Sequence, residues 1–174
     1  MNNLFRYEQL KQETVTAEQF KQVLEVEFSG NEPYPAEVIK QIYVEDKKDV
    51  NFVCVDNSTN KIVAHIATNP QSKRRNGSVF VVNLIVSPNY RRLGVAQNLI
   101  YTACKHYLAQ GETKVMSISV DKINQPAINL YKKVGFEIKD PICPADEDDE
   151  QYILAAEMPT LVKTIEALNK GKEK

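Results

Sequence analysis

The stretch from Val79 to Gln110 constrains the fold more than any other part of the 174-residue chain. Residues 79–86 are aliphatic or aromatic except Asn83. A run of this length that ends in Ser-Pro predicts a strand covered on both faces. From Val95 onward apolar residues recur at helical spacing until Gly111, which predicts a helix. The stretch is therefore predicted to form a strand, a tight turn and a helix.

The turn between this strand and this helix carries groups that bind phosphate in proteins. Gly94 has no Cβ and Ala96 has a small side chain, so a ligand can approach the N–H groups that a first helical turn leaves unpaired. These donors and the helix dipole favour a pyrophosphate. Arg91 and Arg92 add guanidinium groups, which are always charged and can bind phosphate through two parallel hydrogen bonds.

Two segments, in this order, resemble the motifs of GNAT-type N-acetyltransferases. Residues 91–96, Arg-Arg-Leu-Gly-Val-Ala, resemble the Gln/Arg-x-x-Gly-x-Gly/Ala pattern of that family's acyl-CoA site. Residues 124–136, Asn-Gln-Pro-Ala-Ile-Asn-Leu-Tyr-Lys-Lys-Val-Gly-Phe, resemble its Asn-x-x-Ala-x-x-Leu-Tyr-x-x-x-Gly-Phe segment at the usual distance. The resemblance covers residues 51–139, and the helices before them resemble the family's acceptor-side lid.

The elements expected along the chain fit that family. Strands are expected at residues 4–10, 52–55, 62–68, 79–86, 114–120, 136–139 and 152–158. Helices are expected at residues 17–28, from Pro35, from Val95 and at residues 124–134, with Thr16 and Gln19 as a capping box for the first. The resemblance implies an α+β fold, in which about seven strands form a mostly antiparallel, splayed mixed sheet with about four flanking helices. We expect a single domain over residues 1–159 and a short surface helix and tail over residues 160–174.

The resemblance also assigns a site for acetyl-CoA. Main-chain groups of Leu84, Ile85 and Val86 are expected to bind the pantetheine arm, and an N–H near Leu84 to polarise the thioester carbonyl. The pyrophosphate is expected to lie against Arg91, Arg92, Leu93, Gly94, Val95 and Ala96. Asn124, at the start of its helix, is expected to contact the cofactor.

The resemblance of residues 124–136 makes Tyr131 the candidate catalytic residue, and a phenol can protonate the thiolate that leaves. Its alternative role is packing, since it lies on the apolar stripe of its helix. The attacking amine must first lose a proton, but the strand at residues 79–86 has no carboxylate, so the base is left open between a water chain and a carboxylate elsewhere. Glu27, Glu32 and Asn83 are candidates for contact with the acceptor, although exposed carboxylates are often only solvated.

Composition argues against several other classes of protein. A net charge of -1 gives no general attraction to nucleic acid or membrane. Cys54, Cys104 and Cys143 lie far apart and in no C-x-x-C pair, so neither a disulfide nor a metal site is expected. No apolar stretch reaches eighteen residues, and the N-terminus lacks a basic segment followed by an apolar one, so we expect a cytoplasmic protein.

The resemblance implies transfer of an acetyl group from acetyl-CoA to a primary amine, by direct attack in a ternary complex. A small amine, a polyamine and a peptide N-terminus remain open as acceptors. The acidic residues 146–150 either recruit a cationic acceptor or solvate a loop, and a homodimer is common in the family. The alternative is a domain that binds acyl-CoA without turnover. A nucleotide-binding protein is disfavoured because G-x-x-x-x-G-K-[ST] and G-x-G-x-x-G are both absent.

Overall fold

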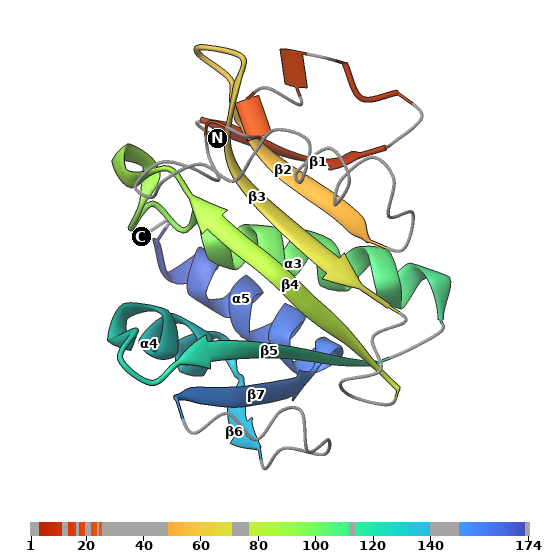
Figure 1. The fold of residues 1–174 in the computed structure, drawn as a ribbon, viewed down its shortest axis with the longest axis vertical. Helices are drawn as coiled ribbons and strands as arrows, with labels where there is room; N and C mark the ends of the chain where they lie inside the picture. The colour runs from red at the N-terminus through yellow and green to blue at the C-terminus, as the bar shows by residue number, and fades with distance from the viewer. Residues whose placement is uncertain are drawn as a thin grey trace. The chain divides into compact units, whose positions relative to one another are not determined.

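A computed structural model describes most of the chain (Figure 1). The described residues are 4–11, 14–16, 18–19, 22–23, 25, 49–70, 77–111, 114–139 and 150–172. They fall into two compact units: residues up to 68 together with residues 83–99, and residues 69–82 together with residues from 100 onward. The strand β4 and the helix α3 each contribute to both units.

Seven strands form one sheet in the order β1-β2-β3-β4-β5-β7-β6. The strands are β1 (Phe5–Leu10), β2 (Val50–Asp56), β3 (Lys61–Asn69), β4 (Ser78–Val86), β5 (Val115–Asp121), β6 (Glu137–Lys139) and β7 (Gln151–Glu157). The pairing of β4 with β5 is parallel, whereas β1 with β2, β2 with β3, β5 with β7 and β6 with β7 are antiparallel. This confirms the predicted mostly antiparallel α+β fold and all seven strands, with bounds shifted by at most two residues.

The helices of the described part are α3 (Val95–Gln110), α4 (Gln125–Val134) and α5 (Met158–Lys172), with a short 3-10 turn η2 (Pro88–Tyr90) before α3. Each described residue between 18 and 25 is helical, which agrees with the first predicted helix. Its capping box is present, because Gln19 N donates to Thr16 Oγ1 at 3.1 Å and Thr16 N to Gln19 Oε1 at 3.0 Å. The helix predicted from Pro35 lies outside the described residues.

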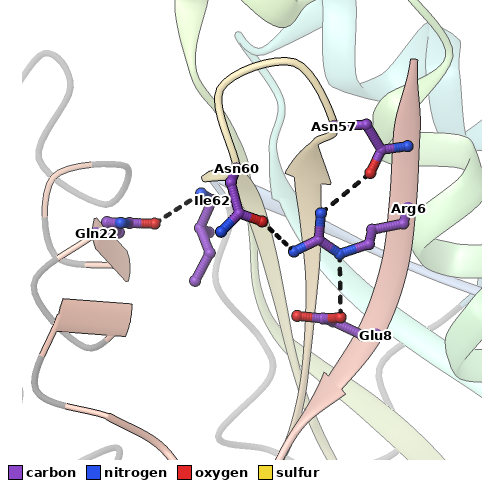
Figure 2. A network of polar contacts seen from close by, with 6 residues as sticks. All are labelled: Arg6, Glu8, Gln22, Asn57, Asn60 and Ile62. Atoms are coloured by element: carbon purple, nitrogen blue, oxygen red, sulfur yellow. Dashed lines mark hydrogen bonds and ion pairs between the residues drawn. The ribbon is translucent and has the colours of Figure 1, made fainter.

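In the first unit, β1, β2 and β3 form an antiparallel sheet with a small apolar cluster on one face. Val23, Val53, Val55 and Ile62 are buried there, and Leu10 and Ile85 pack against them. The pairing of β2 with β3 shifts register between Cys54 and Val55. Beside this irregularity Gln22 Oε1 accepts a hydrogen bond from Ile62 N at 2.8 Å (Figure 2). The helical segment before residue 25 is thus attached to β3 through a backbone amide.

In the second unit, β5 lies between β4 and β7. α4 begins at the cap Asn124, whose side chain accepts a hydrogen bond from Ala127 N, and ends at Gly135 with φ 118°. Only glycine adopts such a backbone conformation without strain. Ile128, Tyr131 and Val134 form the buried face of α4, as the apolar spacing predicted.

The C-terminal helix differs from the prediction of a short surface helix. α5 has 15 residues and begins at Met158 rather than after residue 160. Met158, Leu161 and Ile165 are fully buried, because their spacing of three and four places them on one face. Pro159 lies in the first turn, where its missing N–H costs no helical hydrogen bond.

The strand β4 also differs from the prediction that both faces are covered along its length. Residues 78–81 are buried and pair with residues 115–118 of β5. Val82 is 46% exposed, and residues 83–86 are half-buried. The buried part of β4 is therefore the part that pairs with β5.

Three structural findings concern the cysteines, membrane spans and metal ligands. Cys54 and Cys104 are free, buried thiols, whereas Cys143 lies outside the described residues. No helix in the described ranges is both long enough and apolar enough to cross a bilayer. Across those same ranges no group of three or more His, Cys, Asp or Glu is placed to hold a metal ion.

Candidate functional site

The turn between β4 and α3 is fixed at its start by backbone hydrogen bonds in the first unit. Ser87 N donates to Val63 O of β3 at 2.9 Å, and Tyr90 N donates to Ser87 O at 2.9 Å. The guanidinium of Arg91 reaches back along the turn, where its Nε donates to Val86 O at 3.1 Å. The end of β4 and the first residues of the turn are therefore held to the sheet.

The next residues have a backbone conformation suited to binding an anion. Arg92 has φ 64° and Gly94 has φ 81°, and turns that contain left-handed residues direct successive N–H groups to one side. Gly94 O accepts hydrogen bonds from Asn98 N at 3.1 Å and from Asn98 Nδ2 at 3.0 Å. These bonds close the first turn of α3, which begins directly after Gly94, at the predicted position.

The N–H groups of this turn are available to a ligand. In the part of the chain that the structure describes, the backbone N–H groups of Leu93, Gly94, Val95 and Ala96 have no acceptor. The first turn of α3 carries no acidic side chain, so the helix dipole there is not compensated from within the helix. The turn offers several donors and the positive end of a helix to one anion.

The charged side chains predicted for this site lie at the surface. Arg91, Arg92 and Leu93 are exposed, and Leu93 is 53% exposed. Since Arg91 uses Nε for Val86, its two Nη atoms have no partner within the described ranges. A guanidinium with this arrangement can still bind phosphate through both Nη atoms.

The residues predicted to contact pantetheine form the second half of β4. Leu84, Ile85 and Val86 are half-buried. Ile85 packs against the apolar cluster of the first unit, so alternation along the strand places Leu84 and Val86 on the opposite face. Asn83 is half-buried as well and takes part in a polar interaction.

Tyr131 and Asn124 belong to the second unit. Tyr131 is 7% exposed, and its ring meets Phe136 edge-on with a centroid distance of 5.9 Å. Burial disfavours the phenolate and raises the pKa of Tyr131 to about 12, so the hydroxyl is protonated at neutral pH. Asn124 is exposed, and its Oδ1 accepts from Ala127 N at 3.3 Å, which leaves the amide nitrogen outside this capping bond.

Several predicted groups lie outside the described residues, namely Glu27, Glu32 and residues 146–149. Sequence reasoning also missed a hydrogen bond from Tyr90 in the turn to Asp56 at the end of β2. The motif contains a tyrosine before Arg91, but no local pattern connects it to an aspartate 34 residues earlier.

A model of the acetyltransferase (GNAT) family matches residues 17–136. The chain belongs to this family. Membership confirms the resemblance that the two motifs indicated and the prediction of an N-acetyltransferase. The matched range contains both motifs and the candidate residues of the site from Glu27 to Tyr131.

Two curated proteins resemble this GNAT chain in sequence. An N-alpha-acetyltransferase of Sulfurisphaera tokodaii is 35% identical over 77 residues, which are 44% of this chain and 46% of that protein. The chain thus matches about half the length of that relative. The L-amino acid N-acetyltransferase AaaT of Escherichia coli is 27% identical over 138 residues, which are 76% of this chain and 78% of that protein.

Solved structures share the fold at low sequence identity. The ribosomal-protein-S18-alanine N-acetyltransferase of Escherichia coli has a TM-score of 0.66 at 18% identity, over 88% of this chain and 94% of that one. The NAA60 protein of Arabidopsis thaliana, solved in complex with acetyl-CoA, has a TM-score of 0.65 at 16% identity, over 89% of this chain and 99% of that one. At these identities the likeness establishes the fold.

Proposed function

We propose that the protein transfers an acetyl group from acetyl-CoA to a primary amine by direct attack in a ternary complex. The observation that carries the proposal is the turn at residues 91–96, which offers N–H groups without acceptors in the described structure at the start of α3. In a chain of the GNAT family, such a turn fits the pyrophosphate of coenzyme A.

The turn at residues 91–96 binds the nucleotide part of coenzyme A. The backbone N–H groups of residues 93–96 donate to the pyrophosphate oxygens, and the guanidinium groups of Arg91 and Arg92 neutralise its charge. Main-chain groups of Leu84, Ile85 and Val86 bind the pantetheine arm, and one N–H near Leu84 stabilises the oxygen of the tetrahedral intermediate. Asn124 contacts the cofactor through its amide nitrogen, because Oδ1 already caps α4.

Tyr131 acts as the general acid of the transfer. The amine nitrogen bonds to the carbonyl carbon, the C–S bond breaks, and the Tyr131 hydroxyl donates its proton to the leaving sulfur. The proton that the amine loses restores Tyr131, so the products are an N-acetyl amine and free CoA. Burial keeps the phenol protonated before each cycle, which is the state that a general acid requires.

The first acceptor class to test is an α-amino group of an amino acid or a peptide N-terminus. The names of both sequence relatives refer to such acceptors, an N-alpha-acetyltransferase and an L-amino acid N-acetyltransferase. Polyamines remain the second class, with residues 146–150 as the candidate site of recruitment. A polyamine substrate held by that segment would show kcat/KM that falls steeply as salt is added.

Calorimetry with acetyl-CoA, CoA, 3′-dephospho-CoA and ADP tests cofactor binding, and a panel of amines then tests turnover. Release of CoA thiol gives the rate, and mass spectrometry identifies the N-acetyl product. Binding of CoA species together with turnover supports the proposal. Binding without turnover of any amine favours the alternative, an acyl-CoA-binding domain without catalysis, and an absence of binding contradicts both.

A further inference from the structure

Tyr90 is the last residue of η2 and connects the pyrophosphate turn to a different part of the first unit. Its hydroxyl donates to Asp56 Oδ2 at 2.9 Å. Its ring meets Phe5 of β1 edge-on, with a centroid distance of 6.1 Å and an interplanar angle of 70°. The residue immediately before the Arg91–Ala96 turn is thus held at both its ring and its hydroxyl.

The acceptor of this hydrogen bond is a carboxylate that other hydrogen bonds also hold. Asp56 Oδ1 accepts from Ser58 N at 2.8 Å and from Ser58 Oγ at 2.7 Å. These bonds, followed by the bond from Tyr90, lower the pKa of Asp56 to about 2. Asp56 is therefore ionised at physiological pH, and Tyr90 makes a charge-assisted hydrogen bond, which is stronger than one between neutral groups.

The hairpin that carries Asp56 is itself fastened to β1 (Figure 2). Arg6 donates from Nη1 to Asn57 Oδ1 at 3.0 Å and from Nη2 to Asn60 Oδ1 at 2.6 Å. The backbone adds a bond from Asn57 N to Leu4 O at 3.0 Å. Because the hairpin is bound to its neighbouring strand on both sides of its tip, Asp56 is a fixed point against which the turn can be positioned.

We propose that Tyr90 is a positioning residue for acyl-CoA: its hydrogen bond to Asp56 orients the turn so that the N–H groups of residues 93–96 and the Arg91 guanidinium converge on the pyrophosphate. Backbone donors bind an anion well when they converge on one place, and a site that is ordered before the ligand binds avoids the free-energy cost of ordering it. The hydrogen bond selects the binding conformation before the ligand arrives. This inference rests on the proposed function, because it concerns the same site.

The test is the substitution Tyr90→Phe, which keeps the ring against Phe5 and removes only the hydroxyl. The dissociation constant for CoA, measured by calorimetry, should rise roughly three- to tenfold, as expected for the loss of one net hydrogen bond. The KM for acetyl-CoA should rise in parallel, whereas kcat at saturating acetyl-CoA and the KM for the amine should stay within about twofold. A residue that only stabilises the fold would not separate these constants.

Tyr101→Phe is the matched control. Tyr101 donates to Glu166 Oε1 at 2.9 Å, so this variant also loses one hydrogen bond from a tyrosine to a carboxylate at the same distance, but in the second unit. Its CoA affinity should equal that of the wild type. If Tyr90→Phe does not fold, Asp56→Asn replaces it, and the loss of the acceptor's charge should weaken CoA binding by a smaller factor.

The outcomes separate this inference from the proposed function. Weaker CoA binding by Tyr90→Phe than by Tyr101→Phe supports the inference. If the wild type binds CoA and Tyr90→Phe binds it equally well, or if both variants lose affinity equally, the positioning role is refuted while the proposed function stands. If the wild type does not bind CoA, both are refuted.

Discussion

The substitution Tyr131→Phe separates the two roles that this residue can have, because it keeps the ring and removes the hydroxyl. The ring fills a buried position and contacts Phe136 edge-on, and phenylalanine preserves both features. The hydroxyl has no hydrogen-bond partner in the ranges that the structure describes. The substitution therefore removes a buried polar atom and leaves the packed ring in place.

The stability of this variant follows from the cost of that atom. A hydroxyl buried without a partner costs roughly 1–3 kcal/mol, so its removal should leave the free energy of unfolding unchanged or raise it by up to about 2 kcal/mol. For a chain of this length about 1 kcal/mol corresponds to a shift of Tm of roughly 2–4 °C. The expected Tm is therefore equal to that of the wild type or several degrees higher.

The activity should change in the opposite direction. Loss of a general acid should lower kcat about tenfold or more, which corresponds to at least about 1.4 kcal/mol of transition-state stabilisation. The affinity for acetyl-CoA should not change. Because the pKa of Tyr131 is about 12, the wild type should show no basic decline of kcat below about pH 10 from this residue.

The assay combines stopped-time measurement of CoA release with calorimetry and thermal unfolding. Tyr152→Phe is the control: Tyr152 is a half-buried tyrosine of the same unit whose ring lies 5.2 Å from Lys122 Nζ, and its loss of a hydroxyl should not affect kcat. A kcat for Tyr131→Phe within twofold of the wild type would show that the residue only packs. A lower kcat accompanied by a lower Tm would also refute this reasoning.

Three further substitutions test other parts of the structure. Gly94→Val should weaken CoA binding about tenfold or more, because φ is 81° there and a branched side chain would stand where backbone meets phosphate. Gly111→Val is the control: φ is 72° at Gly111, and a Cβ added there has no neighbouring atom within 4 Å. This control should lower stability without changing the CoA affinity measured by calorimetry. Asp56→Asn should have a lower Tm than the wild type at pH 7, and this difference in Tm should shrink as pH falls from about 4 toward 2. The reason is that the pKa of Asp56 is lowered, so its carboxylate stabilises the fold only while it is ionised. A difference in Tm that is the same at pH 4 and at pH 2 would contradict this prediction. Leu161→Ala should lower the free energy of unfolding, measured in urea titrations, by about 2–5 kcal/mol, because Leu161 is fully buried. Lys163→Ala, on the exposed face of α5, should change this free energy by less than about 0.5 kcal/mol. Equal effects of the two substitutions would show that α5 is not part of the core.

Local chemistry explains why much of the fold could be predicted. The capping box of Thr16 and Gln19 and the stop of α4 at Gly135 depend on residues within a few positions of each other. The start of α3 directly after Gly94 depends on the same kind of short-range bonding. Sequence spacing contains this information directly, so the elements were located to within a few residues.

Contacts between distant segments could not be predicted in the same way. The bond from Tyr90 to Asp56 joins two turns, and the bond from Ile62 N to Gln22 Oε1 lies beside a register shift between β2 and β3. The burial of α5 depends on which elements pack against it, and the spacing of its own apolar residues does not specify those elements. Each of these features can be seen only in the tertiary structure, because the periodicity of a sequence does not identify the distant residue that a side chain contacts.

The predicted pyrophosphate turn and the predicted general acid Tyr131 come from different motifs, but both present hydrogen-bond donors without an acceptor in the described structure. A folded chain pairs nearly all of its buried polar groups, because a donor that is buried without a partner costs about 1–3 kcal/mol, and the first turn of a helix leaves N–H groups that the helix itself cannot pair. Within the described ranges, the N–H groups of residues 93–96 and the hydroxyl of Tyr131 are donors without acceptors. Groups beside the turn are paired, through the amide of Asn98, the Nε atom of Arg91 and the hydroxyl of Tyr90, and these bonds hold the open donors in place. A site that must receive oxygen atoms of a pyrophosphate, and a phenol that must give a proton to sulfur, both need donors that the fold itself leaves unused.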